Sequence, residues 1–244
     1  MKINDQIYLV GSGLLGMNQT DKYDCNVYLV DGGDSLILID SGAGINPSKI
    51  VEEIVRNGYR PEMIDYILLT HAHADHSGGA HSLQQISGAK IVCSKDTANM
   101  IKEADEEKMS LVSSKKTGVY PRDYTFHRVT DCIEVCDQDT LQIGGLTIQV
   151  IETPGHSHDS ISFYMEEIHT LLSGDLVFDR GKIAKLSTWD FSLQDLKKSI
   201  NRVADLSIDV LLPGHMSPVV RNGHDAIRKA KGIFDQHKIP ESIV

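Results

Sequence analysis

The stretch Thr70-His71-Ala72-His73-Ala74-Asp75-His76 directly follows the apolar run Tyr66-Ile67-Leu68-Leu69. Short apolar runs predict buried strands, and a strand delivers the residues after it to the edge of a sheet. Three imidazoles and one carboxylate therefore gather at one sheet edge. The first two imidazoles alternate with small alanines and can converge on one point, whereas the carboxylate and the last imidazole are offset and can face a second point. This layout predicts a site for two metal ions.

Three further apolar runs lead in the same way through a Gly or Thr to a side chain that can ligate a metal. These runs are Leu146–Ile151, which leads to His156, Thr170–Gly174, which leads to Asp175, and Asp209–Gly214, which leads to His215. The glycines let the backbone pass close to a site. Four repeats of one construction are hard to explain by a purely structural role, so we expect these strand ends to supply metal ligands.

The order H-x-H-x-D-H, then a later His, an Asp and a final His, resembles the signature of the metallo-β-lactamase-fold hydrolase superfamily. The resemblance spans most of the chain, from Asp40 to His215. It implies an α/β fold, a four-layer αβ/βα sandwich of the metallo-β-lactamase type. Helices would lie outside two packed sheets. The metal site would lie at one edge of those sheets.

By this resemblance the ligands divide into two sets joined by a bridging carboxylate. The first set is His71, His73 and His156, the second is Asp75, His76 and His215, and the bridge is Asp175. We expect two divalent metal ions, with zinc as the typical metal and iron or manganese as alternatives. A hydroxide that bridges two metals is a strong nucleophile at neutral pH. Two carboxylates would assist catalysis: Asp75 can orient the nucleophile and shuttle a proton, and Asp40 would steady the histidine-rich loop.

Differences from known subfamilies narrow the expected function. The commonest metallo-β-lactamases carry Cys in place of Asp175, flavodiiron proteins carry Glu in place of His73, and acyl-homoserine lactonases carry Tyr in place of Phe178. The metal site resembles that of glyoxalase II, with Asp as the bridging ligand. We predict a binuclear metal-dependent hydrolase that cleaves an ester, thioester or lactone of a small molecule. Two alternatives stay open: a mononuclear iron persulfide dioxygenase-like enzyme, and a phosphodiesterase or nuclease of the same fold.

Composition argues against several classes of partner. The 244 residues include 24 basic and 34 acidic side chains, and the net charge of −10 argues against nucleic acid or an anionic membrane as a partner. No stretch approaches the roughly 20 apolar residues of a membrane span. The start, residues 1–6, lacks the basic and apolar segments of a secretion signal, and the four cysteines fit free thiols. We therefore expect a cytoplasmic enzyme with a small-molecule substrate; the sequence does not specify its oligomeric state.

The pattern along the chain predicts a single domain over residues 1–244, made of two similar halves at about 1–100 and 130–244. A polar, aperiodic segment at about 103–130 joins them and is either a solvated connection or a substrate-facing flap. Candidate substrate-binding residues lie in this segment and after the bridging carboxylate; they are Tyr120, Phe178, Arg180 and Trp189. The alternative for Trp189 is a core residue that anchors the next helix. That helix is predicted to begin at Ser192, which Asp195 follows in a capping-box-like pattern.

Overall fold

The computed structural model describes residues 1–244. The chain divides into two compact units, which are Met1–Val135 with Ile143–Gly145, and Cys136–Gln142 with Leu146–Val244. Each unit contains most of one mixed β-sheet with flanking helices. No helix in the structure has the length and apolar character needed to cross a membrane.

The first sheet has six strands in the order β1-β2-β3-β4-β5-β6. The strands are β1 (Ile7–Gly11), β2 (Val27–Asp31), β3 (Leu36–Ile39), β4 (Ile64–Leu68), β5 (Lys90–Ser94) and β6 (Cys132–Val135). The first three pair antiparallel, and β3 to β6 pair in parallel. Parallel strands that are buried on both faces have nearly continuous apolar sequences. Strand β3, with the sequence Leu-Ile-Leu-Ile, is an example. The parallel arrangement places the ends of β3 and β4 at the same edge.

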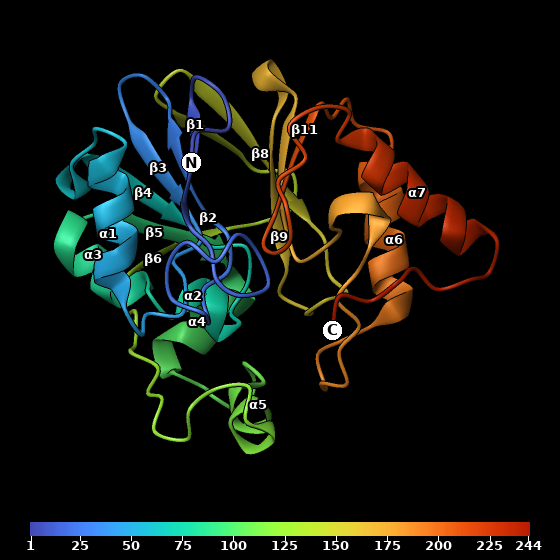
Figure 1. The fold of residues 1–244 in the computed structure, drawn as a ribbon, viewed down its shortest axis with the longest axis horizontal. Coiled ribbons are helices and arrows are strands. Elements are labelled where there is room, and N and C mark those ends of the chain that lie inside the picture. The colour runs from blue at the N-terminus through green and yellow to red at the C-terminus, as the bar shows by residue number, and fades with distance from the viewer. The chain divides into compact units, whose positions relative to one another are not determined.

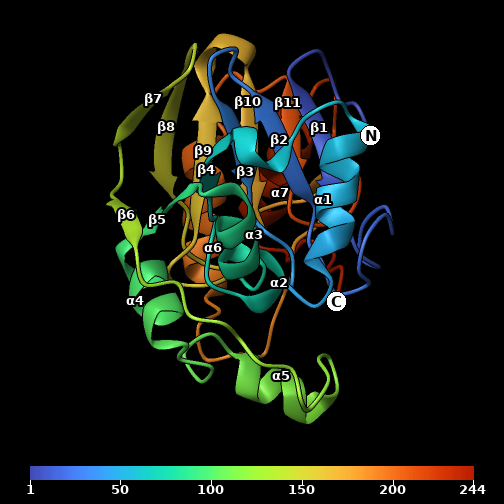
Figure 2. The ribbon, with the colours of Figure 1, turned by 90° about the vertical axis from the view of Figure 1, so that its left-hand side faces the viewer.

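Helices flank this first sheet, with α1 and α3 beside it in Figure 1 and α5 beyond its end in Figure 2. They are α1 (Pro47–Arg56), α2 (Ala74–Ser77), α3 (Ala80–Ser87), α4 (Lys95–Glu103) and α5 (Leu111–Thr117), with a short 3₁₀ turn η1 (Pro61–Met63). Helix α1 shows why the sequence forms such elements. Pro47 fits its first turn, and Ile50 and Ile54 are buried on one face.

The second sheet has five strands in the order β11-β10-β9-β8-β7. The strands are β7 (Thr140–Ile143), β8 (Leu146–Glu152), β9 (Ile161–Met165), β10 (Thr170–Gly174) and β11 (Val210–Pro213). Strands β10 and β11 are parallel, whereas β9 is antiparallel to both β8 and β10. Strands β8 and β10 therefore run in the same direction. Together with β11, they end at one edge of the sheet.

Two helices, α6 (Leu193–Val203) and α7 (His224–Asp235), pack together in the second unit (Figure 1). Two 3₁₀ turns, η2 (Glu166–Ile168) and η3 (Asp179–Gly181), complete it. The side chain of Ser192 accepts a hydrogen bond from the backbone N–H of Asp195, which confirms the predicted helix start. Leu196, Ile200 and Phe234 are buried with strand residues in the core of this unit.

The segment at 103–130 differs from a solvated connection. It contains helix α5, and six of its apolar side chains belong to the core of the first unit. These buried residues are Met109, Leu111, Tyr120, Tyr124, Phe126 and Val129. Charged residues surround them in the sequence, which hides their periodicity. A substrate-facing role for this segment stays a prediction.

Candidate metal centre

Asp40 organises the metal-binding loop of the first unit. It follows β3, and its backbone N–H donates to Leu68 O at the end of β4 over 2.8 Å. The carboxylate of Asp40 accepts from the backbone N–H of Thr70 at 2.8 Å and lies 2.8 Å from Nδ1 of His76. The Thr70 hydroxyl is 2.9 Å from the same carboxylate and 3.0 Å from Nδ1 of His71. One buried carboxylate thus orients one candidate ligand directly and a second through Thr70.

The histidine-rich loop is also fixed by its backbone. Helix α2 begins directly after His73, whose carbonyl accepts from the N–H groups of His76 and Ser77 at 3.0 Å. Both the N–H and the hydroxyl of Ser41 donate to the carbonyl of His76, over 2.8 and 2.7 Å. These hydrogen bonds therefore fix the backbone of the loop at the end of β4.

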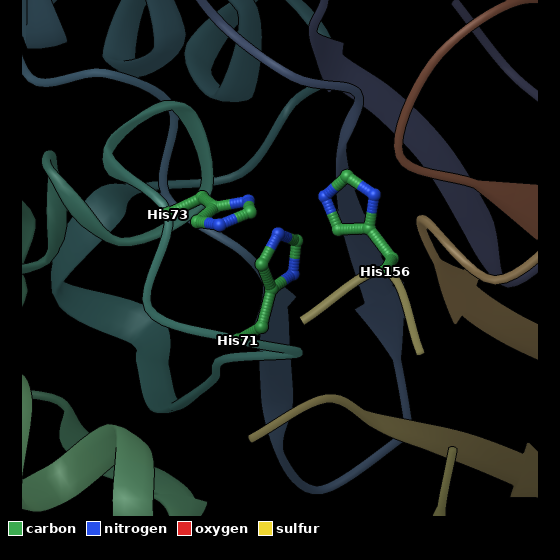
Figure 3. A group of neighbouring side chains, drawn as sticks. All are labelled: His71, His73 and His156. Carbon is green, nitrogen blue, oxygen red and sulfur yellow. The ribbon is translucent and has the colours of Figure 1, made fainter. Parts of the chain in front are cut away.

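The imidazoles of this loop lie side by side. The ring centroid of His71 is 4.7 Å from that of His73 and 4.1 Å from that of His76. Figure 3 labels His71 and His73 on the loop after β4, together with His156, which comes from the loop after β8. Nε2 of His76 is 3.6 Å from Oδ2 of Asp75. The first unit thus brings together all four ligand-type residues predicted for it.

The second unit brings together the other three. Asp175 and His215 follow the adjacent parallel strands β10 and β11, and the two ends are tied by a hydrogen bond from Gly214 N–H to Gly174 O of 2.8 Å. His156 follows β8, which ends at the same edge. Oδ2 of Asp175 lies 3.4 Å from Nε2 of His156 and 3.3 Å from Nε2 of His215. All three side chains are buried.

A glycine is required in the loop that carries His156. Gly155 has a φ of 143°, and a Cβ there would lie 2.2 Å from the backbone nitrogen of Leu196 at the start of α6. The carbonyl of Gly155 accepts from the N–H of Ser192 at 2.8 Å. Close contact with the start of α6 therefore sets the path of the chain into His156.

The donor distances fit metal coordination. Two donors that each lie roughly 2.0–2.1 Å from one zinc ion at a tetrahedral angle are about 3.3–3.4 Å apart. The Asp175–His156 and Asp175–His215 separations of 3.4 and 3.3 Å match this value, and the Asp75–His76 separation of 3.6 Å is close to it. Imidazole and carboxylate donors are the usual ligands of zinc and of similar divalent metals. Each unit thus holds metal-binding His and Asp groups.

Cys25 is a buried neighbour of this site. Its sulfur, a carboxylate oxygen of Asp40 and a ring nitrogen of His76 all lie within 4.8 Å of one another. Burial raises the pKa of the Cys25 thiol to about 12, so the group stays a neutral thiol. This agrees with the sequence-based interpretation of a buried free thiol. Sequence reasoning did not identify Thr70, although its position beside His71 was an available signal.

The candidate substrate residues have different surroundings. Tyr120 and Phe178 are buried, and the ring of Phe178 lies 6.1 Å from that of His215. The side chain of Arg180 is exposed and pairs with Asp179. Trp189 is 60% exposed, so it is not a core residue; its ring lies 4.9 Å from that of His158. Substrate contact by these four residues stays a prediction.

Comparisons with known proteins agree with this geometry. The family model described as Metallo-beta-lactamase superfamily matches residues 20–215. A probable metallo-hydrolase of Methanocaldococcus jannaschii is 31% identical over 79% of this chain and 88% of its own length. An atrochrysone carboxyl ACP thioesterase of Aspergillus fumigatus is 30% identical over 78% of this chain, which spans only 38% of that protein.

Solved structures give the same fold. A metallo-beta-lactamase family protein of Thermus thermophilus has a TM-score of 0.74 at 22% identity, covering 97% of this chain and 80% of its own. A subclass B3 metallo-beta-lactamase of Bradyrhizobium japonicum also has a TM-score of 0.74, at 21% identity, with 97% and 91% covered. The fold class predicted from the sequence is therefore confirmed.

Proposed function

Because this chain belongs to the metallo-beta-lactamase superfamily, we propose that it is a binuclear hydrolase that cleaves a thioester, ester or lactone bond of a small molecule. Membership and its metallo-hydrolase relative identify it as a metal-dependent hydrolase. The substrate class, the number of metals and their identity are the proposal. A cytoplasmic location, expected from the sequence, is likewise proposed.

One observation carries the binuclear proposal. A single oxygen of Asp175 lies at coordination spacing from the imidazoles of both His156 and His215. The two sets of ligands assigned by family order place these imidazoles on different metals, so this carboxylate would bridge them. His71 and His73 would join His156 at the first metal, and Asp75 and His76 would join His215 at the second.

The chemistry follows from the donor set and this chain's own side chains. Bound divalent metals lower the pKa of water and stabilise negative charge on a substrate oxygen. Asp75, whose side chain is 20% exposed, can accept a proton on its carboxylate and orient the attacking water. The buried Asp40 keeps Nδ1 of His76 occupied, so that Nε2 is the atom available to a metal.

A thioester is the preferred substrate class within this proposal. One relative, the atrochrysone carboxyl ACP thioesterase, is named as a thioesterase. It is 30% identical over 78% of this chain, although this chain spans only 38% of that protein. A thioester carbonyl also needs no strong acid to expel its leaving group, because a thiolate is a comparatively stable anion. The titratable groups described at the site are carboxylates and imidazoles, and a thiolate can leave without a stronger acid than these.

The proposal is tested by metal analysis and a substrate panel. Protein prepared without chelator should contain two divalent ions per chain. It should hydrolyse acyl-N-acetylcysteamine thioesters faster than phenyl esters, lactones or a phosphodiester, and D175A should abolish this activity. A single iron per chain with consumption of oxygen would support the persulfide dioxygenase alternative instead. A preference for the phosphodiester would support the nuclease alternative.

A further inference from the structure

Ser199 interrupts the apolar face of helix α6. Leu196, Ile200 and Val203 on that face are fully buried in the core of the second unit, and Ser199 is buried with them at 4% exposure. A buried hydroxyl is unfavourable unless it forms a hydrogen bond. A helical serine can donate to the carbonyl four residues earlier, but Ser199 donates to Pro154 O over 2.7 Å. The hydroxyl therefore serves a contact outside its own helix.

The accepting carbonyl lies in the loop that carries the candidate ligand His156. This loop joins β8 to β9, where Glu152 is paired with Ile161. Pro154 is two positions before His156 and has no N–H. Its carbonyl is therefore the only backbone group of this residue that can form a hydrogen bond. One buried hydroxyl thus holds the chain directly before the ligand.

Two further contacts join α6 to the same loop. The N–H of Ser192, the residue that caps α6, donates to Gly155 O over 2.8 Å. Gly155 also packs so closely on the helix that an added Cβ would lie 2.2 Å from Leu196 N. Positions 192, 196 and 199 are four and three residues apart and so lie on one side of the helix. Helix α6 therefore makes a continuous line of contacts with the two residues before His156.

Other hydrogen bonds of this loop join its own residues. The N–H of Gly155 donates to Ser157 O over 3.0 Å, and the hydroxyls of Ser157 and Ser160 lie 2.7 Å apart. Bonds of this kind fix the shape of a hairpin loop, but they leave it able to tilt about the two strands that carry it. The contacts with α6 oppose such a tilt, because they join the loop to a different element.

We propose that Ser199 is a positioning residue of the metal centre: its hydroxyl holds the backbone before His156 so that this imidazole meets Asp175. Nε2 of His156 lies 3.4 Å from Oδ2 of Asp175, the separation of two donors on one ion. A loop that tilted away from α6 would carry the imidazole away from a carboxylate that follows β10. The inference rests on the proposed ligand role of His156. Ser199 would support a ligand of the second unit as Asp40 does in the first.

The test compares S199A with T170V. Each variant loses one buried hydroxyl of the second unit that donates to a backbone carbonyl, but Thr170 donates to Ile168 O and begins β10 at the end away from Asp175. Metal-free protein is titrated with Zn²⁺ in competition with a chromophoric chelator. We expect S199A to bind one ion about 10- to 100-fold less tightly, and T170V to bind as the wild type does.

Two measurements separate the placement of His156 from a general effect on packing. Alanine is the better helix former, so S199A does not weaken α6 itself. In Co²⁺-loaded protein, the visible absorption reports ligand geometry, and S199A should change this spectrum whereas T170V should not. In metal-free protein, hydrogen exchange at residues 155–158 should be faster in S199A, with exchange within α6 unchanged. Wild-type Zn²⁺ affinity in S199A, or an equal loss in T170V, would overturn the proposal.

These measurements need no substrate. A failure of the thioester assay with a weakened ion in S199A would reject the proposed function and keep the positioning role. The reverse result, hydrolysis with unchanged affinity in S199A, would reject only the positioning role. In an active enzyme, S199A should lower kcat more than it changes KM, because the hydroxyl acts through a metal ligand and touches no substrate.

Discussion

Oδ2 of Asp40 lies 2.8 Å from Nδ1 of His76, although the two residues are 36 positions apart in the chain. Both side chains are almost completely buried. The carboxylate accepts a hydrogen bond from Nδ1–H, which favours the tautomer in which Nε2 carries the lone pair. Metal-binding histidines commonly have such a carboxylate partner.

Replacing Asp40 by Asn should weaken metal binding. We expect D40N to bind metal about 10- to 100-fold less tightly, because the amide is uncharged and can also turn its NH₂ group toward His76. Competition with a chromophoric chelator measures the affinity. The exposed Asp5, which pairs with Lys2 at the surface, gives the control variant D5N. Equal affinity in D40N and D5N would contradict the positioning role of Asp40.

Removal of the bridging carboxylate should have a larger effect. D175A should lose at least one ion and nearly all activity together, because the same oxygen serves the imidazoles of His156 and His215. Elemental analysis of the purified variant gives the metal content. Asp179, four positions further along, provides the control D179A, which should keep both ions. If D175A retained its metals at wild-type occupancy, the bridging assignment would be wrong.

The backbone at Gly155 predicts a loss of stability on substitution. An alanine Cβ there would lie 2.2 Å from the nitrogen of Leu196, whereas at Gly58, where φ is 90°, no atom lies within 4 Å of it. G58A should cost roughly 1–2 kcal/mol of unfolding free energy for its left-handed backbone. G155A should cost about 1–3 kcal/mol more, because the chain must move. Urea unfolding of the metal-free proteins measures both. Equal costs would show that the loop shifts freely.

Cysteine reactivity tests the environment of the site. Burial raises the pKa of Cys25 to about 12, whereas Cys136 is exposed. The raised pKa leaves almost no thiolate at about pH 8, and the thiolate is the reactive form. Iodoacetamide should therefore modify Cys136 in the folded protein and leave Cys25 intact, as mass spectrometry of peptides would show. Comparable rates at the two cysteines would mean that the loop around Cys25 opens.

The clustering of the candidate metal ligands could be predicted because each of them follows a short apolar run. The start of α6 at Ser192 likewise followed from its capping residues. Local signals of this kind need only a few neighbouring residues. The parallel pairing of β10 with β11 then explains why Asp175 and His215 meet.

The segment at 103–130 was not predictable in the same way. Its buried residues are separated by charged ones, so no helical or strand period is visible around Leu111 or Tyr120. The hydrogen bond from the Tyr124 hydroxyl to Ala43 O depends on how this segment folds back onto the loop after β3. Such a contact is set by tertiary packing and leaves no local pattern. The same holds for Thr70, whose role depends on the neighbouring strand end at Asp40.

The parallel pairing of β10 with β11 also makes metal binding depend on the correct strand register. Leu172 lies opposite Leu212, and this register sets the spacing of 3.3 Å between Asp175 and His215. A slip by one residue would move one ligand by about 3.3 Å along its strand and turn its side chain to the other face of the sheet. A slipped chain could not bind metal at both residues. Metal available during synthesis would thus select correctly paired molecules and stabilise them against the misaligned ones.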